Sequence, residues 1–75
     1  KAVDPDTVLI GEVGLGGEVR SVPRIESRVK EAIQMGFKRC IIPKRNLKGF
    51  SKEMQDKIQL IGVDMVEEAV NAVMK

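Results

Sequence analysis

Residues 11–43 decide the fold, and they read GEVGLGGEVRSVPRIESRVKEAIQMGFKRCIIP. The glycines at the start predict a tight turn, because glycine adopts positive φ without steric cost. An amphipathic helix follows, since apolar residues recur at i, i+4, i+7 and i+8 as Ile25, Val29, Ala32 and Ile33. Gly36 is expected to end this helix, and the apolar run up to Pro43 predicts a buried strand.

The segment before the glycines predicts one arm of a β-hairpin. Residues 7–10 form a continuous apolar run, which is typical of a strand covered on both faces. Residues 18–22 alternate between polar and apolar side chains, as a half-exposed strand does. We therefore expect a hairpin over residues 7–22, with Pro23 as the first residue of the helix that follows.

The helix-then-strand pattern repeats after Pro43. Residues 44–49 are polar and basic, and we expect a loop there. Ser51 predicts the N-cap of a short helix that ends near Lys57, and residues 59–63 predict a third buried strand.

A last helix is predicted at the end of the chain. Asp64 and Glu67 have the spacing of a capping box. The helix after them has an apolar stripe of Val66, Ala69, Val70 and Val73. The order is then β-β-α-β-α-β-α, which predicts the α/β (α+β) class: a β-hairpin followed by α-β-α-β-α, with the first helix as a right-handed crossover. We expect a single domain over residues 1–75.

Composition excludes several classes of protein. The chain is 43% hydrophobic and 32% charged, which is typical of a globular domain. It has no apolar run near the roughly 18 residues that span a bilayer and no signal-peptide pattern, so we expect a cytoplasmic protein without membrane partners. Lys1 in place of Met suggests a piece of a longer chain. Cys40 is the single cysteine and is expected to be reduced and buried, and without histidine we expect no metal site.

Charge is concentrated in the middle of the chain. Residues 1–19 and 53–75 are each acidic by three charges, whereas residues 20–52 carry a net +8. The acids of this central part are Glu26 and Glu31, and its ten bases are Arg20, Arg24, Arg28, Lys30, Lys38, Arg39, Lys44, Arg45, Lys48 and Lys52. The pattern alone leaves three interpretations open: a nucleic-acid surface, an interface to an acidic neighbour, or a solvated face.

Sequence motifs of nucleotide binding and catalysis are absent. A GxGxxG motif that starts at Gly14 would need glycine at Val19, and no glycine is followed by the Lys-Ser/Thr of a phosphate loop. The few hydroxyls and the one thiol have no histidine to serve as a base. Read by themselves, the residues argue against an enzyme active site.

Several segments resemble one family closely. GEVGLGGEVR (residues 11–20), RIESRVKEA (24–32), GFKR (36–39) with IPK (42–44), and IQLIGVDMVEEAV (58–70) are similar to the C-terminal Lon-protease-like domain of the bacterial DNA repair family RadA, also called Sms. The resemblance extends from about Asp4 to the end of the chain. It implies the C-terminal part of a Lon-protease-like (ribosomal protein S5 domain 2-like) fold, whose first half would lie upstream.

The resemblance also implies a function. RadA-type proteins join a zinc-binding module and a RecA-like ATPase core to this domain, so zinc and ATP/Mg²⁺ are expected in those other parts and no cofactor in these 75 residues. Such proteins act on DNA in repair and recombination, assemble as hexameric rings, and work with recombination proteins of the RecA type. The Lon-like domain is expected to scaffold the ring and to offer a basic surface to DNA.

One position bears on peptidase activity. Lon proteases use a serine–lysine dyad, and their GGLKEK-type motif aligns with residues 23–28, which places Glu26 at the catalytic lysine. A carboxylate cannot replace that base, so the resemblance implies a domain that is not a peptidase.

Our first hypothesis is therefore a non-catalytic scaffold and DNA-contacting module of a RadA-type ATPase. The residues expected to touch DNA are Arg24, Arg28, Lys38, Arg39, Lys44, Arg45 and Lys48. Two alternatives stay open: a fragment of an ATP-dependent Lon-type serine–lysine peptidase, and a purely oligomeric ring scaffold whose basic loop meets an acidic surface of the next subunit.

Overall fold

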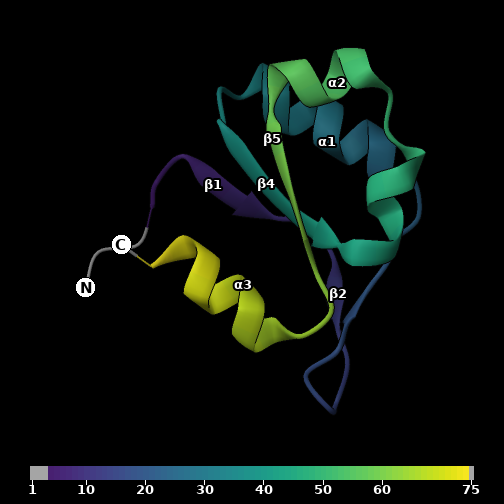
Figure 1. Ribbon diagram of the computed structural model, residues 1–75, viewed down its shortest axis with the longest axis vertical. Coiled ribbons are helices and arrows are strands. Elements are labelled where there is room, and N and C mark those ends of the chain that lie inside the picture. The colour runs from purple at the N-terminus through teal and green to yellow at the C-terminus, as the bar shows by residue number, and fades with distance from the viewer. Residues whose placement is uncertain (1–3, 75) are drawn as a thin grey trace.

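A parallel sheet is built around strand β4 (Arg39–Pro43), as Figure 1 shows. The computed structural model describes residues 4–74. β4 pairs in parallel with β1 (Thr7–Leu9) on one side and with β5 (Gln59–Val63) on the other. In this register Val8 lies opposite Cys40, and Ile41 lies opposite Ile61. The order β1-β4-β5 leaves the most buried strand in the centre.

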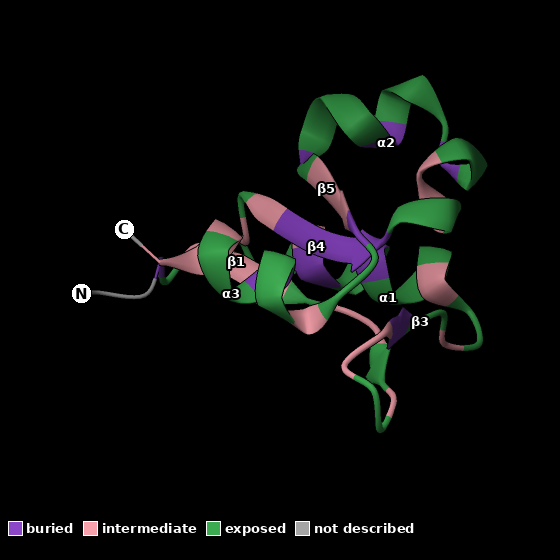
Figure 2. Cartoon of the chain, turned by 60° about the horizontal axis from the view of Figure 1, so that its bottom comes forward, coloured by how far each residue is buried: buried purple, intermediate pink, exposed green. Residues whose placement is uncertain are grey.

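The core follows β4 (Figure 2). Cys40, Ile41 and Ile42 are fully buried. Because successive side chains of a strand point to opposite faces, Cys40 and Ile42 enter one apolar cluster and Ile41 enters another. The sheet is thus the middle of three layers, and each face needs its own cover.

Helices α1 (Ile25–Gln34) and α2 (Lys52–Lys57) cover the first face. Val29 and Ala32 of α1 are buried there, as the helical spacing predicts. Met54 of α2 joins the same cluster, and the Ser51 hydroxyl caps α2 by accepting a hydrogen bond from the Met54 N–H at 3.2 Å. The predicted stripe of α1, the predicted cap and the ends of β4 and β5 are confirmed.

The second face is covered by α3 (Val66–Val73) and by a small hairpin of β2 (Glu12–Val13) and β3 (Val19–Arg20). Two backbone hydrogen bonds fix the hairpin beside the end of β5. The Val19 N–H donates to the Asp64 carbonyl at 2.8 Å, and the Val66 N–H donates to the Gly17 carbonyl at 2.7 Å. These bonds hold β3 at the carboxyl end of the sheet.

The prediction of one hairpin over residues 7–22 is wrong. The antiparallel pair covers only 12–13 and 19–20, and β1 joins the parallel sheet instead. A strand that is apolar on both faces fits a layered parallel sheet better than a hairpin arm. Gly11 lies between β1 and β2, where the chain passes close to β3. A methyl group on Gly11 would lie 2.9 Å from Cγ1 of Val19. The crossover through α1 therefore starts from β1.

Helix α1 begins two residues later than Pro23 predicts. Arg24 has φ 59 and ψ 40, a left-handed backbone that no right-handed helix can contain, so it forms the N-cap and Ile25 is the first helical residue. The other end agrees with the prediction, because Gly36 follows the helix with φ 92.

The predicted loop at residues 44–49 is a short 3₁₀ helix, η1 (Lys44–Gly49). It packs on β5, because Leu47 lies against Gly62, where any side chain would collide with it. The predicted cap of α3 is shifted by one residue. Met65 is the N-cap, and the Glu68 carboxylate accepts hydrogen bonds from the Asp64 and Met65 N–H groups, each at 3.0 Å.

One residue of the predicted α3 stripe is outside the core. Val66, Ala69 and Val73 pack against the sheet, but Val70 is half exposed and Ala72 packs in its place. The apolar strip that α3 covers is narrow, formed by Ile41, Ile61 and Val63. A wide apolar stripe is therefore not needed on this helix.

Candidate nucleic-acid interface

A cleft of about 620 Å³ opens at the carboxyl ends of β4 and β5. Three segments form its walls: residues 18–21 of the hairpin, residues 43–45 after β4, and residues 64–65 after β5. This is the end of a parallel sheet where ligands generally bind, because the loops that leave the strands meet there. The cleft is therefore the first place to look for a binding site.

Lys44 and Arg45 reach this cleft because β4 ends at Pro43, directly before them. Both residues are exposed and lie at the start of η1. The ion pairs found among residues 4–74 use neither of them. Two free cations at one mouth can attract an anion.

Arg20 is the third base of the cleft, and the predicted set of DNA-contacting residues does not include it. The hairpin carries it there, through the bonds between β3 and the residues after β5. Its guanidinium donates to the Glu18 carboxylate, and both side chains are more than a third exposed. The sequence does contain one signal for Arg20, because this residue follows the glycine turn in a segment of alternating polar and apolar residues. The signal does not place Arg20 in the cleft, because the residues that lie around it there come from distant parts of the chain.

The pKa of Glu18 is lowered, chiefly by a hydrogen bond from its own backbone N–H and next by the bond from Arg20. The carboxylate is thus charged near neutral pH. Together with Asp64 it gives the cleft two acids beside its three bases. The cleft is therefore basic but not uniformly so.

Lys38 and Arg39 lie at the other end of the sheet, at the start of β4. Arg39 contacts the buried Asp4 carboxylate, and the Lys38 ammonium lies 3.9 Å from the Asp6 carboxylate. The predicted basic residues therefore form two groups, one at each end of β4.

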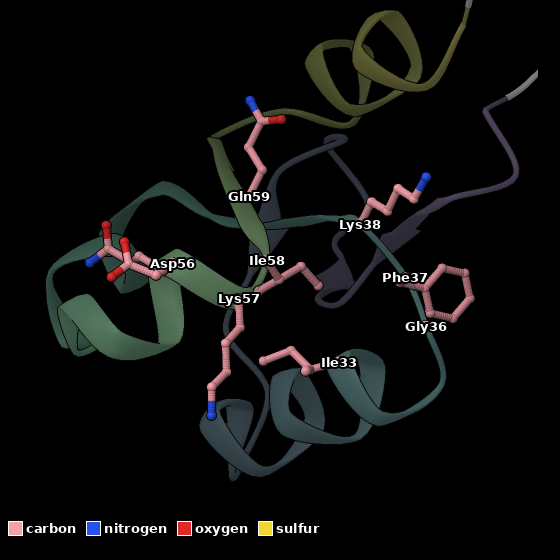
Figure 3. A pocket seen from close by; sticks show the side chains of 9 residues that line it. Ile33, Gly36, Phe37, Lys38, Asp56, Lys57, Ile58 and Gln59 are labelled. Carbon is pink, nitrogen blue, oxygen red and sulfur yellow. The ribbon is translucent and has the colours of Figure 1, made fainter.

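A second pocket, of about 570 Å³, lies near Lys38 at the amino end of β5 (Figure 3). Ile33 and Ile58 lie in its middle, while the ammonium groups of Lys38 and Lys57 point to different sides. Because its charges diverge, this pocket presents no focused basic surface.

The remaining predicted bases lie outside the cleft lining. Arg24 is the exposed N-cap of α1, and Lys48 is exposed in the last turn of η1. Arg28 is exposed in α1 and lines a groove of about 410 Å³ along β1, whose other walls include Leu9 and Met35. The structure brings together Lys44, Arg45 and the unpredicted Arg20.

The groups considered for peptidase chemistry are not assembled. Glu26 is exposed in the first turn of α1, where a carboxylate suits the helix dipole. Ser21 lines the cleft with Lys44, but its hydroxyl bonds weakly to the Val22 carbonyl at 3.4 Å, and no serine–lysine hydrogen bond occurs in the described part of the chain. Cys40 is fully buried, as predicted, and this burial raises the pKa of its thiol to about 11.

Within residues 4–74, no three of the acidic or cysteine side chains lie close enough to hold a metal ion. Over the same residues, none of the helices has the length and apolar character needed to cross a membrane.

Comparison with known proteins identifies the family. A sequence model of the family described as "Subunit ChlI of Mg-chelatase" matches residues 1–46, more than half of the chain. The chain belongs to this family. Relatives with curated names add a second finding: a "DNA repair protein RadA" from Bacillus subtilis (strain 168) is 57% identical over 67 residues, which are 89% of this chain and 14% of the relative.

Two further relatives have the same name. The protein from Chlamydia muridarum is 52% identical over 60 residues, 80% of this chain and 13% of the relative. The protein from Streptococcus pneumoniae is 40% identical over 73 residues, 97% of this chain and 17% of the relative. The resemblance to RadA proteins is thus confirmed, and the chain spans about a sixth or less of the length of these relatives.

Proposed function

We propose that this chain is a non-catalytic module of a RadA-type DNA repair protein and that its cleft contacts DNA phosphates. The names of the relatives support the biological setting, because three "DNA repair protein RadA" sequences are 40–57% identical to most of the chain. The proposal places the module in a Lon-protease-like frame within a longer ATP-dependent protein. ATP, Mg²⁺ and zinc belong to other parts of such a protein and have no role in the cleft.

The observation that carries the DNA-contacting role is the pair Lys44 and Arg45 beside Arg20. Three bases at one cleft mouth, two of them without an acidic partner among residues 4–74, can neutralise neighbouring phosphates and release their counterions. None of the described residues that line the cleft is aromatic, so they offer phosphate contacts and no stacking of bases. Binding should therefore depend on salt and little on sequence.

One residue supports the non-catalytic part of the proposal, and its neighbour supports the Lon-like frame. Glu26 stands where the Lon-type motif has its catalytic lysine, and the left-handed Arg24 stands where the same motif has its second glycine. A left-handed position explains a glycine in that motif. The backbone of Arg24 is thus consistent with the proposed frame, and the identity of Glu26 is consistent with the lack of the lysine base.

The test is the affinity of the folded chain for labelled single-stranded and duplex DNA, measured by fluorescence anisotropy across a salt series. Lys44→Glu/Arg45→Glu should weaken binding at least about tenfold at low salt and reduce the salt slope by about two. Lys30→Glu/Lys52→Glu makes the same change of charge outside the cleft lining and serves as the matched control. Equal weakening by both double variants, or no binding by the unchanged chain, contradicts the proposal.

The ring scaffold is the alternative that this experiment addresses. If Lys44→Glu/Arg45→Glu leaves DNA affinity unchanged but alters the mass measured by light scattering, the bases meet protein instead of DNA.

A further inference from the structure

The glycine turn of the hairpin is folded around an anion that the chain itself supplies. The Gly17 N–H donates to the Gly14 carbonyl at 3.0 Å, which closes the turn, and the Gly14 N–H donates to the Glu18 carbonyl at 2.9 Å. The Glu18 side chain then bends back over the turn. A methyl group on Gly16 would lie 2.8 Å from Oε2 of Glu18, and one on Gly14 would collide with Oε1.

One side-chain donor holds this carboxylate. It accepts a hydrogen bond from the Arg20 guanidinium. Hydrogen bonds from the backbone of Glu18 and Gly16 contribute to its lowered pKa. A guanidinium binds a carboxylate oxygen and a phosphate oxygen by the same charge-assisted hydrogen bond. The carboxylate therefore occupies a position that suits an oxyanion.

The same guanidinium belongs to the cleft. Arg20 and Glu18 line it together with Lys44 and Arg45. As long as Glu18 holds Arg20, the positive charge that Arg20 offers to a phosphate is neutralised. The Arg20 and Glu18 side chains are 59% and 37% exposed, so an incoming phosphate has access to both partners of the pair.

We propose that Glu18 is an internal competitor of DNA phosphate for Arg20, and that Arg20 is the phosphate-binding residue on the hairpin side of the cleft. This inference rests on the proposed function and adds to it two residues, one that contacts phosphate and one that limits the contact. When DNA binds, Arg20 exchanges the Glu18 carboxylate for a phosphate oxygen.

The experiment uses the DNA-binding measurement on the folded chain with Glu18→Gln and Arg20→Gln. Glu18→Gln should bind about two- to fivefold more tightly at low salt, the range that corresponds to the coupling of an exposed ion pair. Arg20→Gln should weaken binding by a similar factor and reduce the salt slope by about one, since one phosphate contact is lost. Arg20→Lys, which keeps the charge, should keep most of the slope.

A double variant separates competition from a general effect of charge. If Glu18 acts through Arg20, Glu18→Gln/Arg20→Gln should bind as Arg20→Gln does. Asp64→Asn removes an equal charge from the same cleft and should tighten binding less than Glu18→Gln. An equal gain from Glu18→Gln with and without Arg20, or an equal gain from Asp64→Asn, overturns the inference.

The outcome also distinguishes this inference from the proposed function. If Lys44→Glu/Arg45→Glu weakens binding while the Glu18 and Arg20 variants bind as the unchanged chain does, the DNA-contacting role stands and the competition is wrong. If the unchanged chain does not bind at low salt, both fail. Circular dichroism and thermal melting of each variant verify that an altered affinity does not arise from unfolding.

Discussion

The guanidinium of Arg39, at the first residue of the central strand, contacts the buried carboxylate of Asp4, which lies 35 positions earlier in the chain. Asp4 is 5% exposed and also accepts hydrogen bonds from the Asp6 N–H at 2.9 Å and the Thr7 hydroxyl at 2.8 Å. The carboxylate therefore joins the turn before β1 to the start of β4. This contact gives Arg39 a structural role that is independent of DNA.

Removing either partner should destabilise the fold. We expect Asp4→Ala to lower the free energy of unfolding by about 2 kcal/mol, because hydrogen bonds to a charged group are lost. Arg39→Ala should cost about 1 kcal/mol, since its side chain is 38% exposed and water screens the charge. Urea unfolding at pH 7 measures both. In the exposed Lys38–Asp6 pair, Lys38→Met should change stability by less than about 0.5 kcal/mol, and an equal loss there would contradict this account.

The left-handed backbone of Arg24 predicts an unusual effect of glycine. Arg24→Gly should be more stable than Arg24→Ala by about 1 kcal/mol, because alanine keeps the strain of φ 59 and glycine removes it. Both variants lose the same charge, so the difference reports on the backbone. Thermal melting of the two variants side by side is the measurement, and an alanine variant as stable as the glycine variant would show that the position is unstrained.

The Cys40 thiol should be unreactive in the folded chain. It is fully buried, so a reagent cannot reach it. Burial also raises its pKa from 9.0 to about 11, so very little thiolate is present at pH 8. Reaction with a thiol reagent such as Ellman's reagent should be slow until urea unfolds the chain. Fast reaction under native conditions would mean that β4 is not buried as described.

The same thiol predicts a loss of stability in alkaline solution. Between pH 9 and about 11 the unfolded chain releases the Cys40 proton while the folded chain keeps it, so stability falls as pH rises through this window. Cys40→Ala should remove this contribution to the slope. Urea unfolding at pH 8, 9 and 10 compares the two chains, and parallel curves would refute the assignment.

Local signals in the sequence were sufficient for several elements. The spacing of Val29 and Ala32, the hydroxyl of Ser51 and the glycine at position 36 all act within one or two turns, so helices and caps could be read from neighbouring letters. The strand that pairs with β1 could not be predicted from neighbouring residues. Whether an apolar strand pairs with the next segment or with β4 depends on packing across the sheet.

The candidate site shows the same limit. Lys44 and Arg45 are adjacent in sequence and follow a strand, so a basic mouth at this position could be predicted. Arg20 reaches the cleft because β3 bonds to the residues after β5, and Arg39 is outside it because it begins β4 at the other end of the sheet, where it contacts Asp4. Both facts join segments far apart in the chain, which charge patterns do not encode.

The hydrogen bond from the Asp4 N–H to the Val73 carbonyl, at 2.7 Å, has a practical consequence. It holds both ends of the described chain together next to the start of β1, as Figure 1 shows, whereas the cleft opens beyond the carboxyl ends of the strands. A fluorophore, an affinity tag or a sensor surface coupled near either end would therefore sit remote from the cleft. Either end can serve as the point of attachment without obstructing access to Arg20, Lys44 and Arg45.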